Sequence, residues 1–404
     1  MTPKVILIGN SDEFLFSMKL FPEMLQRLLR QRGVEVLLIR PKTIFGKFAP
    51  WAGPLGKWLF YVDKFLIFPF VLKSVLWRER APGLIVHVCD HSNAMYVHRL
   101  REVAHLVTCH DMMPMKSAMG EVPQNPTSWT GKCFQRLILR GLKRARFVAC
   151  VSTASQCDLM RIAGLPAEQT RVIFNSLNHP YTPMSPAEAR SRIKARVGVE
   201  GPYLLHVGSN SWYKNRLGVF AIYAGLRRRL LEKGTAVMPK LVYAGPSLQR
   251  EIASLPEWNP EMERDIIFVK GPDNETLRAL YSEAELLLFP SWDEGFGWPI
   301  IEAQACGCRV VTTNKAPMTE VGGDAAFYID PHDSPGAAAV VLGILEQPLT
   351  ERRTAIEKGI VNAGRFTEDR MIADYLEVYH QLIREHCGQA RVEMPPLTPT
   401  HEQK

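Results

Sequence analysis

The sequence predicts an α/β protein made of two doubly wound parallel-sheet domains. Short apolar runs rich in β-branched residues alternate with longer amphipathic segments, which is the pattern of strands joined by helices in parallel sheets. This pattern loosens after Asn175 and starts again near Tyr203. A chain of 404 residues also exceeds one ordinary core and fits two domains of roughly 150–200 residues each. Two such domains predict a cleft between them.

The expected elements follow in chain order. In the first domain, residues 1–180, strands are expected at 5–8, 34–39, 84–88, 106–109, 147–151 and 171–174. Residues 181–200 form the predicted linker, with a helix at 186–197. In the second domain, residues 201–365, strands are expected at 203–207, 240–244, 266–269, 285–289, 309–312 and 326–329. A helix is expected over 366–388, and 389–404 read as a loose tail rich in proline and threonine.

Charge is distributed unevenly over the chain. Residues 1–180 hold 24 Lys and Arg against 12 Asp and Glu, whereas the remainder holds 25 against 29. The first domain is therefore the basic one. Such a split suggests that this domain meets something anionic, such as a membrane surface or a phosphate-bearing substrate.

The segment from Glu294 to Glu302 carries the densest chemical signal. In open parallel sheets ligands bind beyond the carboxyl ends of the strands, and Glu294 follows the strand expected at 285–289. Pro299 marks the first turn of a helix that contains Glu302. The helix amino terminus offers N–H donors and positive potential to a diphosphate. The two carboxylates can accept hydrogen bonds from hydroxyl groups beside it.

Glu294, seven intervening residues and Glu302 resemble the E-x7-E signature of the family 4 glycosyltransferases, here with Gly295, Phe296 and Gly297 after the first glutamate. The glycines allow the backbone to approach a ligand closely. The resemblance implies the GT-B architecture of two Rossmann-like domains and a carboxyl-terminal helix that crosses back to the first domain. It further implies that the first glutamate contacts hydroxyls of the donor sugar and that the second holds the ribose. The alternative interpretation is a helix-terminal acid plus an ordinary surface acid.

A second candidate segment follows the first strand of the second domain. Gly208 allows close backbone approach, and a cation beyond it can neutralise a diphosphate leaving group. Lys214 matches the phosphate-binding lysine of the resembled family, and Asn215 follows it. The preceding position, often arginine in relatives, is Tyr213. Arg216 is a candidate for the second cation, with a role on the helix surface as the alternative.

Two further strand ends are expected near the nucleotide. Gly245 follows the strand at 240–244, and Lys270 and Gly271 follow the strand at 266–269. The resemblance implies that the backbone around Lys270 and Gly271 borders the nucleobase. A plain turn between strand and helix is the alternative.

In the first domain, His110 follows the strand expected at 106–109 and faces the predicted cleft. It resembles a strand-end histidine that lies beside the transferred sugar in the same family. A strand-end histidine satisfied locally is the alternative. His87, Asp90 and His91 form a similar but weaker cluster, and the first loop, 9–13, contains a single glycine where relatives often carry two.

The resemblance implies transfer of a hexose-type sugar from a nucleotide-diphosphate sugar to an acceptor hydroxyl, with retention of anomeric configuration. The expected catalytic residues are His110, Glu294 and Lys214. The sequence has no Asp-x-Asp metal site, so we expect neither metal nor cofactor, with Lys214 and helix dipoles in place of a divalent cation. The expected setting is polysaccharide or glycolipid assembly, with a saccharide or lipid-linked saccharide as acceptor and no nucleic-acid partner.

The sequence leaves two other functions open and disfavours a third. A nucleotide-sugar epimerase or hydrolase on the same fold would release or alter the sugar without an acceptor. A non-catalytic nucleotide-sugar-binding protein is suggested by Tyr213 and by the sparse first loop. A nicotinamide-dependent dehydrogenase is disfavoured, because no G-x-G-x-x-G follows the first strand.

The stretch 51–80 mixes aromatic residues with lysines and arginines. Charged residues and Pro69 interrupt a run already near the minimum of roughly 20 residues for a bilayer span, so the stretch fits a lipid interface better than a transmembrane helix. A second basic cluster lies at Lys143, Arg144 and Arg146. We therefore expect a cytoplasmic protein, since the first apolar run is too short for a signal peptide, with peripheral attachment to an anionic membrane as a hypothesis. The alternative is a helix pair in the core with a solvated basic edge.

Overall fold

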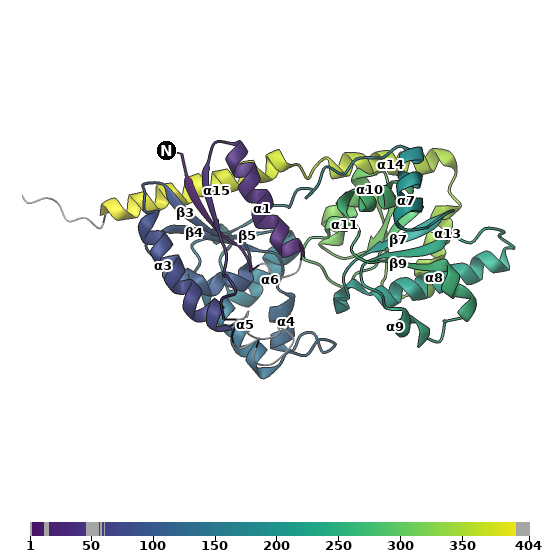
Figure 1. Cartoon of the computed structure of the whole chain (residues 1–404), viewed down its shortest axis with the longest axis horizontal. Coiled ribbons are helices and arrows are strands. Elements are labelled where there is room, and N and C mark those ends of the chain that lie inside the picture. Colours follow the sequence, from purple (N-terminus) through teal and green to yellow (C-terminus); the bar gives the residue numbers. More distant parts are fainter. Residues whose placement is uncertain (1, 12–15, 46–55, 57–58, 60, 393–404) are drawn as a thin grey trace, which may run out of the picture.

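The computed structural model describes residues 2–11, 16–45, 56, 59 and 61–392. It contains two six-stranded parallel sheets with helices on both faces of each, and the sheets lie in two bodies joined end to end (Figure 1). The predicted fold class is therefore confirmed. Residues 12 and 13 of the first loop, most of 46–60 and residues 393–404 lie outside the described residues.

The first sheet has the strand order β2-β1-β3-β4-β5-β6 and is parallel throughout. The direction of winding changes between β1 and β3, so a crevice is expected at their carboxyl ends. The strands are β1 (Lys4–Ile8), β2 (Glu35–Ile39), β3 (Leu84–Val88), β4 (Ala104–Cys109), β5 (Val148–Cys150) and β6 (Thr170–Val172).

The second sheet has the order β12-β11-β10-β7-β8-β9, in which the switch lies between β7 and β10. Counted from β7, this is the Rossmann order, whereas the first sheet has a different one. The strands are β7 (Tyr203–Val207), β8 (Lys240–Ala244), β9 (Ile266–Val269), β10 (Leu286–Phe289), β11 (Val310–Thr313) and β12 (Ala326–Ile329).

Helices connect the strands. The α-helices are α1 (Phe16–Gln31), α3 (Phe68–Arg78), α4 (Met113–Met119), α5 (Trp129–Leu142), α6 (Thr153–Ala163), α7 (Pro186–Arg196), α8 (Arg216–Glu232), α9 (Gln249–Ala253), α10 (Asn274–Glu283), α11 (Trp298–Ala305), α12 (Met318–Gly322), α13 (Ser334–Leu345), α14 (Leu349–Ala363) and α15 (Glu368–Val392). Short 3-10 or π segments are η2 (Asp63–Ile67), η3 (His91–Arg99), η4 (Ala167–Gln169), η5 (Trp212–Lys214), η6 (Pro260–Asp265) and η7 (Gly323–Ala325).

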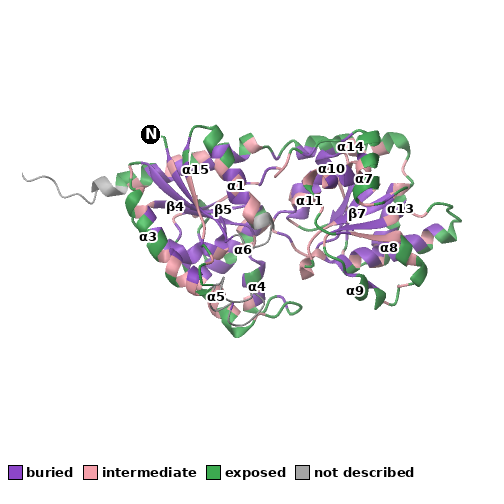
Figure 2. Cartoon of the chain, in the orientation of Figure 1, coloured by how far each residue is buried: buried purple, intermediate pink, exposed green. Residues whose placement is uncertain are grey.

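The first domain has a core on each face of its sheet, because successive strand residues point to opposite faces. Ile6 and Ile8 belong to one buried cluster, and Val5 and Leu7 to the other. The sheets are accordingly buried while the outer faces of the helices are exposed (Figure 2). Runs of buried apolar residues are typical of strands covered by helices on both sides.

Helix α15 packs against the first sheet, although it follows the second domain in the chain (Figure 1). Tyr379 and Thr108 each bond one ring nitrogen of His87, at 2.8 and 2.7 Å, and Tyr375 bonds Thr108 at 3.0 Å. His87 is therefore fully engaged inside the core and is not a residue of the cleft. The helix continues to Val392, so residues 389–392 are helical and do not belong to a loose tail as predicted; Gln389, Ala390 and Arg391 have good helix propensity.

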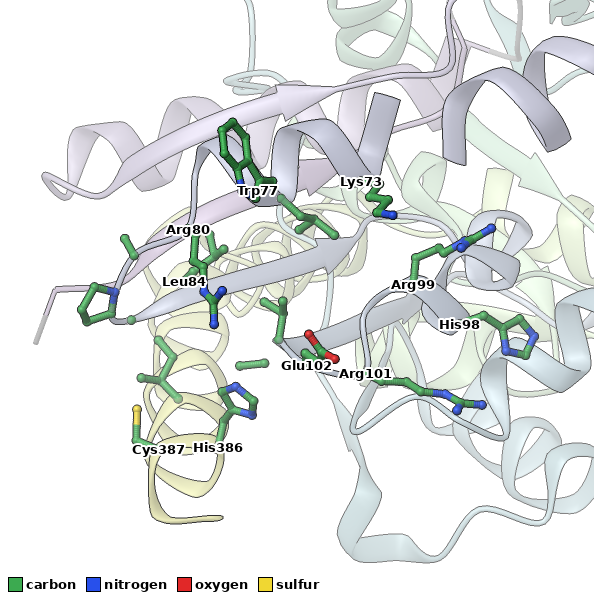
Figure 3. A pocket seen from close by; sticks show the side chains of 17 residues that line it. Lys73, Trp77, Arg80, Leu84, His98, Arg99, Arg101, Glu102, His386 and Cys387 are labelled. Atoms are coloured by element: carbon green, nitrogen blue, oxygen red, sulfur yellow. The ribbon is translucent and has the colours of Figure 1, made fainter. Parts of the chain in front are cut away.

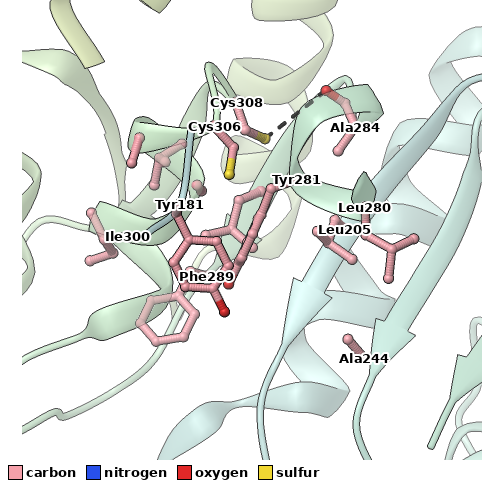
Figure 4. Close-up of a cluster of buried hydrophobic side chains, with 14 of the residues drawn as sticks. Tyr181, Leu205, Ala244, Leu280, Tyr281, Ala284, Phe289, Ile300, Cys306 and Cys308 are labelled. Carbon is pink, nitrogen blue, oxygen red and sulfur yellow. Dashed lines mark hydrogen bonds between the residues drawn. The ribbon is translucent and has the colours of Figure 1, made fainter. Parts of the chain in front are cut away.

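One core cluster of the second domain extends to the linker (Figure 4). Tyr181 of the linker and Tyr281 of α10 pack edge to face with ring centroids 5.9 Å apart, close to Phe289 of β10. Phe289, which precedes the loop after β10, and Ile300 of α11, which follows it, both pack in this cluster. Both ends of the loop are therefore anchored in the core.

Candidate active site

The candidate site lies at the switch point of the second sheet, beyond β7 and β10. Gly208 follows β7 and the loop 290–297 follows β10. Crevices at the carboxyl ends of strands that wind in opposite directions are where open α/β sheets bind ligands. The predicted residues of both segments meet here.

Lys214 and Glu294 form an ion pair at this position. The Nζ of Lys214 lies 2.8 and 3.0 Å from the two carboxylate oxygens of Glu294, and the two side chains are 12% and 6% exposed. Burial raises the pKa of Glu294, and Lys214 opposes that shift. The ammonium also lies 4.9 Å from the ring centroid of Phe289. Each charge of a buried ion pair compensates the burial of the other. Removing one partner therefore leaves an uncompensated buried charge, which destabilises the folded state.

The local backbone explains how Lys214 reaches the crevice. Asn215 adopts a left-handed conformation, with φ 48°, between η5 and α8. Asparagine tolerates this region better than most residues. Its Nδ2 donates to the carbonyl oxygen of Pro290 at 3.0 Å, which ties the Lys214 turn to the β10 loop. The turn that carries Lys214 and the loop after β10 are therefore held together as one structural unit.

Arg216 is buried beneath this unit and does not lie on the helix surface. Its guanidinium lies 5.1 Å from the ring of Tyr243 and donates through Nη1 to Asn210. Nε and Nη2 are buried and have no hydrogen-bond partner among the described residues. Burial lowers the pKa of Arg216, yet the group stays charged at neutral pH. Unpaired buried donors are costly, so these N–H groups are suited to bind an anion.

Gly245 and Gly208 bring two strand ends close together beside Arg216. A Cβ added at Gly245 would lie 2.1 Å from the carbonyl oxygen of Gly208 and 3.5 Å from Nη2 of Arg216. No other residue fits at Gly245. At Gly208 an added Cβ would lie 3.1 Å from Nε2 of His206, which is also buried without a partner among the described residues. Burial lowers the pKa of His206 to about 3, so the ring is neutral.

Glu302 is buried in the first turns of α11. Oε1 accepts from Nδ2 of Asn178 at 3.1 Å, and Oε2 accepts from the hydroxyl of Tyr281 at 2.9 Å. Burial raises the pKa of Glu302 to about 7, despite these two bonds. The carboxyl group is consequently near half ionisation at neutral pH. Each oxygen keeps a second lone pair for a further donor.

Helix α11 begins directly after the loop. Gly297, with φ 102°, turns the chain into the helix, and Pro299 occupies its first turn. The free N–H groups and the dipole at this end favour an anion. Phe296 packs in the core with Phe366 at a centroid distance of 5.7 Å, so its side chain supports the loop from below.

His110 lies on the opposite side, at the end of β4. It is 5% exposed, and its Nε2 donates to the carbonyl oxygen of Cys89 at 2.9 Å. The ring's lone pair is therefore on Nδ1. Burial lowers the pKa of His110, which favours a neutral imidazole. A Cβ at Gly295 would lie 2.1 Å from the carbonyl oxygen of His110, so the two predicted segments touch across the domains.

The first sheet's switch point holds polar side chains of a different kind. Asn10, after β1, donates to the carboxylate of Asp90, after β3, and accepts from Nδ2 of Asn93 at 2.5 Å. Asp90 also accepts from the backbone N–H of Ser92 at 2.7 Å, and Nδ1 of His91 lies 3.5 Å from it. Asp90 and His91 thus form a cluster with Asn10 without contact to Lys214 or Glu294 in the described residues.

Further contacts hold the two domains together beside Glu294. The hydroxyl of Ser152 donates to the carbonyl oxygen of Gly295 at 2.7 Å. Glu320 accepts from the backbone N–H groups of Thr153 and Ala154 at 2.8 and 3.1 Å, at the start of α6. Lys116 bonds Asp293 at 2.6 Å. The loop carrying Glu294 is fixed on both sides of the cleft.

Two of the predicted site residues, Lys270 and Gly271, lie apart from the ion pair of Lys214 and Glu294. Lys270 is exposed at the end of β9, the edge strand, and Gly271 follows it with φ 59°. No contact among the described residues joins either to the ion pair.

Asn178, Tyr281 and His206 belong to the site but were not predicted from the sequence. A linker amide, a helix tyrosine and a strand histidine carry no signal of their own.

Two features are absent from the described residues. No three His, Cys, Asp or Glu side chains in the described ranges are grouped to hold a metal ion. None of the helices in the described part of the chain combines the length and the apolar character that crossing a bilayer requires.

The fold and the crevice define a two-domain glycosyltransferase architecture of the GT-B class. Sucrose-phosphate synthase from Thermosynechococcus elongatus has this fold, with a TM-score of 0.73 at 20% identity over 95% of this chain and 100% of that one. Residues 23–179 match Glycosyltransferase Family 4, and residues 201–347 match Glycosyl transferases group 1. The chain therefore belongs to the family 4 glycosyltransferases.

Relatives of known name support this membership. The chain is 27% identical over 250 residues to the O-antigen chain mannosyltransferase B of Escherichia coli, covering 61% of this chain and 64% of that protein. It is 26% identical over 243 residues to the O-antigen chain mannosyltransferase RfbU of Salmonella typhimurium, covering 60% and 61%. The matches thus span less than two thirds of the length of these relatives.

Proposed function

We propose that this protein transfers a hexose-type sugar from a nucleotide-diphosphate sugar to an acceptor hydroxyl, with retention and without a metal ion. The observation that carries the proposal is the pair of buried cations at the second switch point. Two guanidinium nitrogens of Arg216, Nε and Nη2, have no hydrogen-bond partner among the described residues, and Lys214 bonds only the carboxylate of Glu294 there. Charge-assisted bonds to phosphate oxygens would satisfy both.

Donor binding would exchange the partner of Lys214. A diphosphate competes with Glu294 for the same ammonium, and the helix α11 amino terminus adds N–H donors to the phosphate. Released from Lys214, the carboxylate of Glu294 can accept hydroxyls of the donor sugar. Glu302 would accept the ribose hydroxyls, since Tyr281 and Asn178 hold it in place. These groups stabilise the departing nucleoside diphosphate as its charge develops.

We propose retention and a role for His110 beside the transferred sugar, and the family membership supports both. His110 reaches the cleft from the first domain, touching the Glu294 loop through its backbone. Its position fits contact with the transferred sugar. The leaving phosphate itself would take the acceptor's proton in a front-face reaction, so we assign no separate general base.

The names of the relatives suggest the acceptor class and the first sugar to test. Two of them are O-antigen chain mannosyltransferases. We propose that this protein also acts in polysaccharide or glycolipid assembly, with a saccharide or lipid-linked saccharide as acceptor and a mannosyl donor as the first candidate.

A thermal-shift screen of UDP-, GDP- and TDP-sugars tests the proposal, because a ligand that binds only the folded state raises the melting temperature, and at equal concentration a tighter ligand raises it more. We expect one nucleotide family to stabilise the wild type and to lose that effect in Glu302→Ala. No shift with any of these donors would contradict the proposal. Turnover without acceptor then separates the alternatives, since steady release of free sugar or an epimerised donor would indicate a hydrolase or an epimerase.

A further inference from the structure

An apolar stripe runs along the outer face of η2 and α3 in the first domain. Leu66, Phe70 and Trp77 are 58%, 71% and 80% exposed, and Val71 is 45% exposed. The spacing of Leu66, Phe70 and Trp77 places these three along one side of the helix, and Val71 lies beside them toward the buried side. The opposite side, with Phe68 among others, is buried in the core. These four residues, the apolar stripe, form a contiguous series rather than scattered surface residues, which usually marks an interaction site.

A basic pocket adjoins the stripe at Trp77 (Figure 3). This cavity of about 600 Å³ is lined by cationic and aromatic side chains from three segments that are distant in sequence. We call this cavity the basic pocket and define it by six of its lining residues: Lys73, Trp77, Arg80, Arg99, Arg101 and His386. It lies at the amino ends of β3 and β4, the edge of the sheet opposite the candidate active site.

The lysine and the three arginines of the basic pocket lack balancing carboxylates in the described part of the chain. Lys73, Arg80, Arg99 and Arg101 form no ion pair with any described residue, although Glu102 also lines the cavity. Burial lowers the pKa of His98 at the rim, and four arginines lower it further: Arg144, Arg101, Arg140 and Arg99. Positive charge is thus concentrated at this site from both η3 and the end of α5.

We propose that the apolar stripe and the basic pocket together form a docking surface for an anionic lipid bilayer. Phe70 and Trp77 would enter the interface at headgroup depth, where aromatic rings are favoured. The arginines beside Trp77 would bind lipid phosphates, which carry the charge that this surface lacks. Peripheral attachment of this kind needs no helix that crosses the bilayer.

Geometry favours a bilayer over a protein partner or a second copy of the chain. Of the four residues of the apolar stripe only Trp77 lines the basic pocket, and the other three lie outside that cavity on the outer face of η2 and α3, where no part of it could enclose a partner's side chains around them. Charged residues are depleted at the centre of protein interfaces, whereas here Lys73 lies between Phe70 and Trp77. Lysines and arginines beside aromatic residues are typical of membrane surfaces.

Flotation of the intact protein with vesicles tests this surface. We expect binding to phosphatidylcholine vesicles that contain about 30% phosphatidylglycerol at about 50 mM salt, and little binding to phosphatidylcholine alone. High salt, about 500 mM, should weaken binding at least tenfold, because the lipid and the arginines interact through charge. Absence of binding to the anionic vesicles at low salt would overturn the proposal.

Two pairs of variants locate the surface. Trp77→Ser should weaken vesicle binding about tenfold, whereas Trp129→Ser, which removes an aromatic residue that is 75% exposed in the same domain, should not. Arg99→Gln with Arg101→Gln should lose about fivefold for each charge and reduce the dependence on salt, whereas Lys358→Gln with Arg353→Gln in the second domain should not.

All six residues altered in these four variants are exposed, so melting temperatures should remain within a few degrees of wild type and confirm folding. Equal binding by Trp77→Ser and wild type, or equal losses in the test and control variants, would overturn the proposal. Light scattering adds a further outcome: dimerisation abolished by Trp77→Ser, without vesicle binding, would mean that a second copy covers the stripe. None of these results depends on the proposed sugar transfer.

Discussion

The crevices of the two sheets differ in the charge of the residues that line them. Beyond β7 and β10, long ionisable side chains predominate, with Lys214 paired to Glu294 and Arg216 buried beside them. Beyond β1 and β3, short side chains such as Asn10 and Asp90 bond one another. A diphosphate needs cations and N–H donors, so the second crevice is suited to bind one and the first is not.

The largest effect should come from Glu294→Gln. This change removes the ionised acceptor for sugar hydroxyls, and we expect turnover to fall about 100-fold or more. The affinity for nucleoside diphosphate should persist or rise, because Lys214 no longer has a competing carboxylate. Steady-state turnover and calorimetry measure the two quantities, with the exposed Glu346→Gln as control. Wild-type turnover by the first variant would remove Glu294 from the sugar site.

Glu302 should make donor binding depend on pH. Its pKa is raised to about 7 by burial, and ribose hydroxyls favour the ionised form, so the affinity for a nucleotide sugar should rise between about pH 6 and about pH 8. Glu302→Gln should abolish this slope and weaken binding by about 1.5–3 kcal/mol at the higher pH. Calorimetry across the range checks it, and an unchanged slope in the variant would contradict the assignment.

The same carboxyl group affects stability with the opposite sign. A folded-state pKa above the unfolded value of 4.5 means that the native state holds the proton longer. Glu302 should therefore reduce the free energy of unfolding as pH rises from 4.5 to about 7. Glu302→Gln should flatten this part of the stability curve of the ligand-free protein, as measured by denaturant unfolding at several pH values.

His110→Ala should have a smaller and selective effect. Because the residue belongs to the first domain, we expect turnover to fall about tenfold while nucleoside-diphosphate affinity changes less than about twofold. Single-turnover kinetics and calorimetry separate the two. If both fall equally, His110 does not act at the sugar alone.

The smallest effect concerns the contact between the domains. Glu320→Ala removes the acceptor for two N–H groups at the start of α6, which should cost about 1 kcal/mol of stability and raise the donor KM about two- to threefold. Glu320→Gln, which retains an acceptor oxygen, should lose less. Identical melting and KM values for wild type and the alanine variant would mean that the contact does not hold the cleft.

The sequence predicted the sheets better than the site. Every strand occurs within two residues of its expected bounds, because buried parallel strands are continuous apolar runs that few other structures require. Lys214 and Glu294 were both placed at strand ends, but their pairing depends on which strands are neighbours in the sheet. The burial that raises the pKa of Glu302, and the hydrogen bonds from Tyr281 and Asn178 that oppose this rise, arise only in the folded chain.

The central claim is that Lys214 and Arg216, and no metal ion, meet the charge of the donor diphosphate. Calorimetric titration of the matching nucleoside diphosphate in excess EDTA tests it most directly, in wild type, in Lys214→Met and in the exposed-lysine control Lys358→Met. We expect full binding by wild type and control, and a loss of about 10- to 100-fold in Lys214→Met. Binding that disappears in EDTA and returns with magnesium or manganese, or equal affinity in all three proteins, would contradict the account.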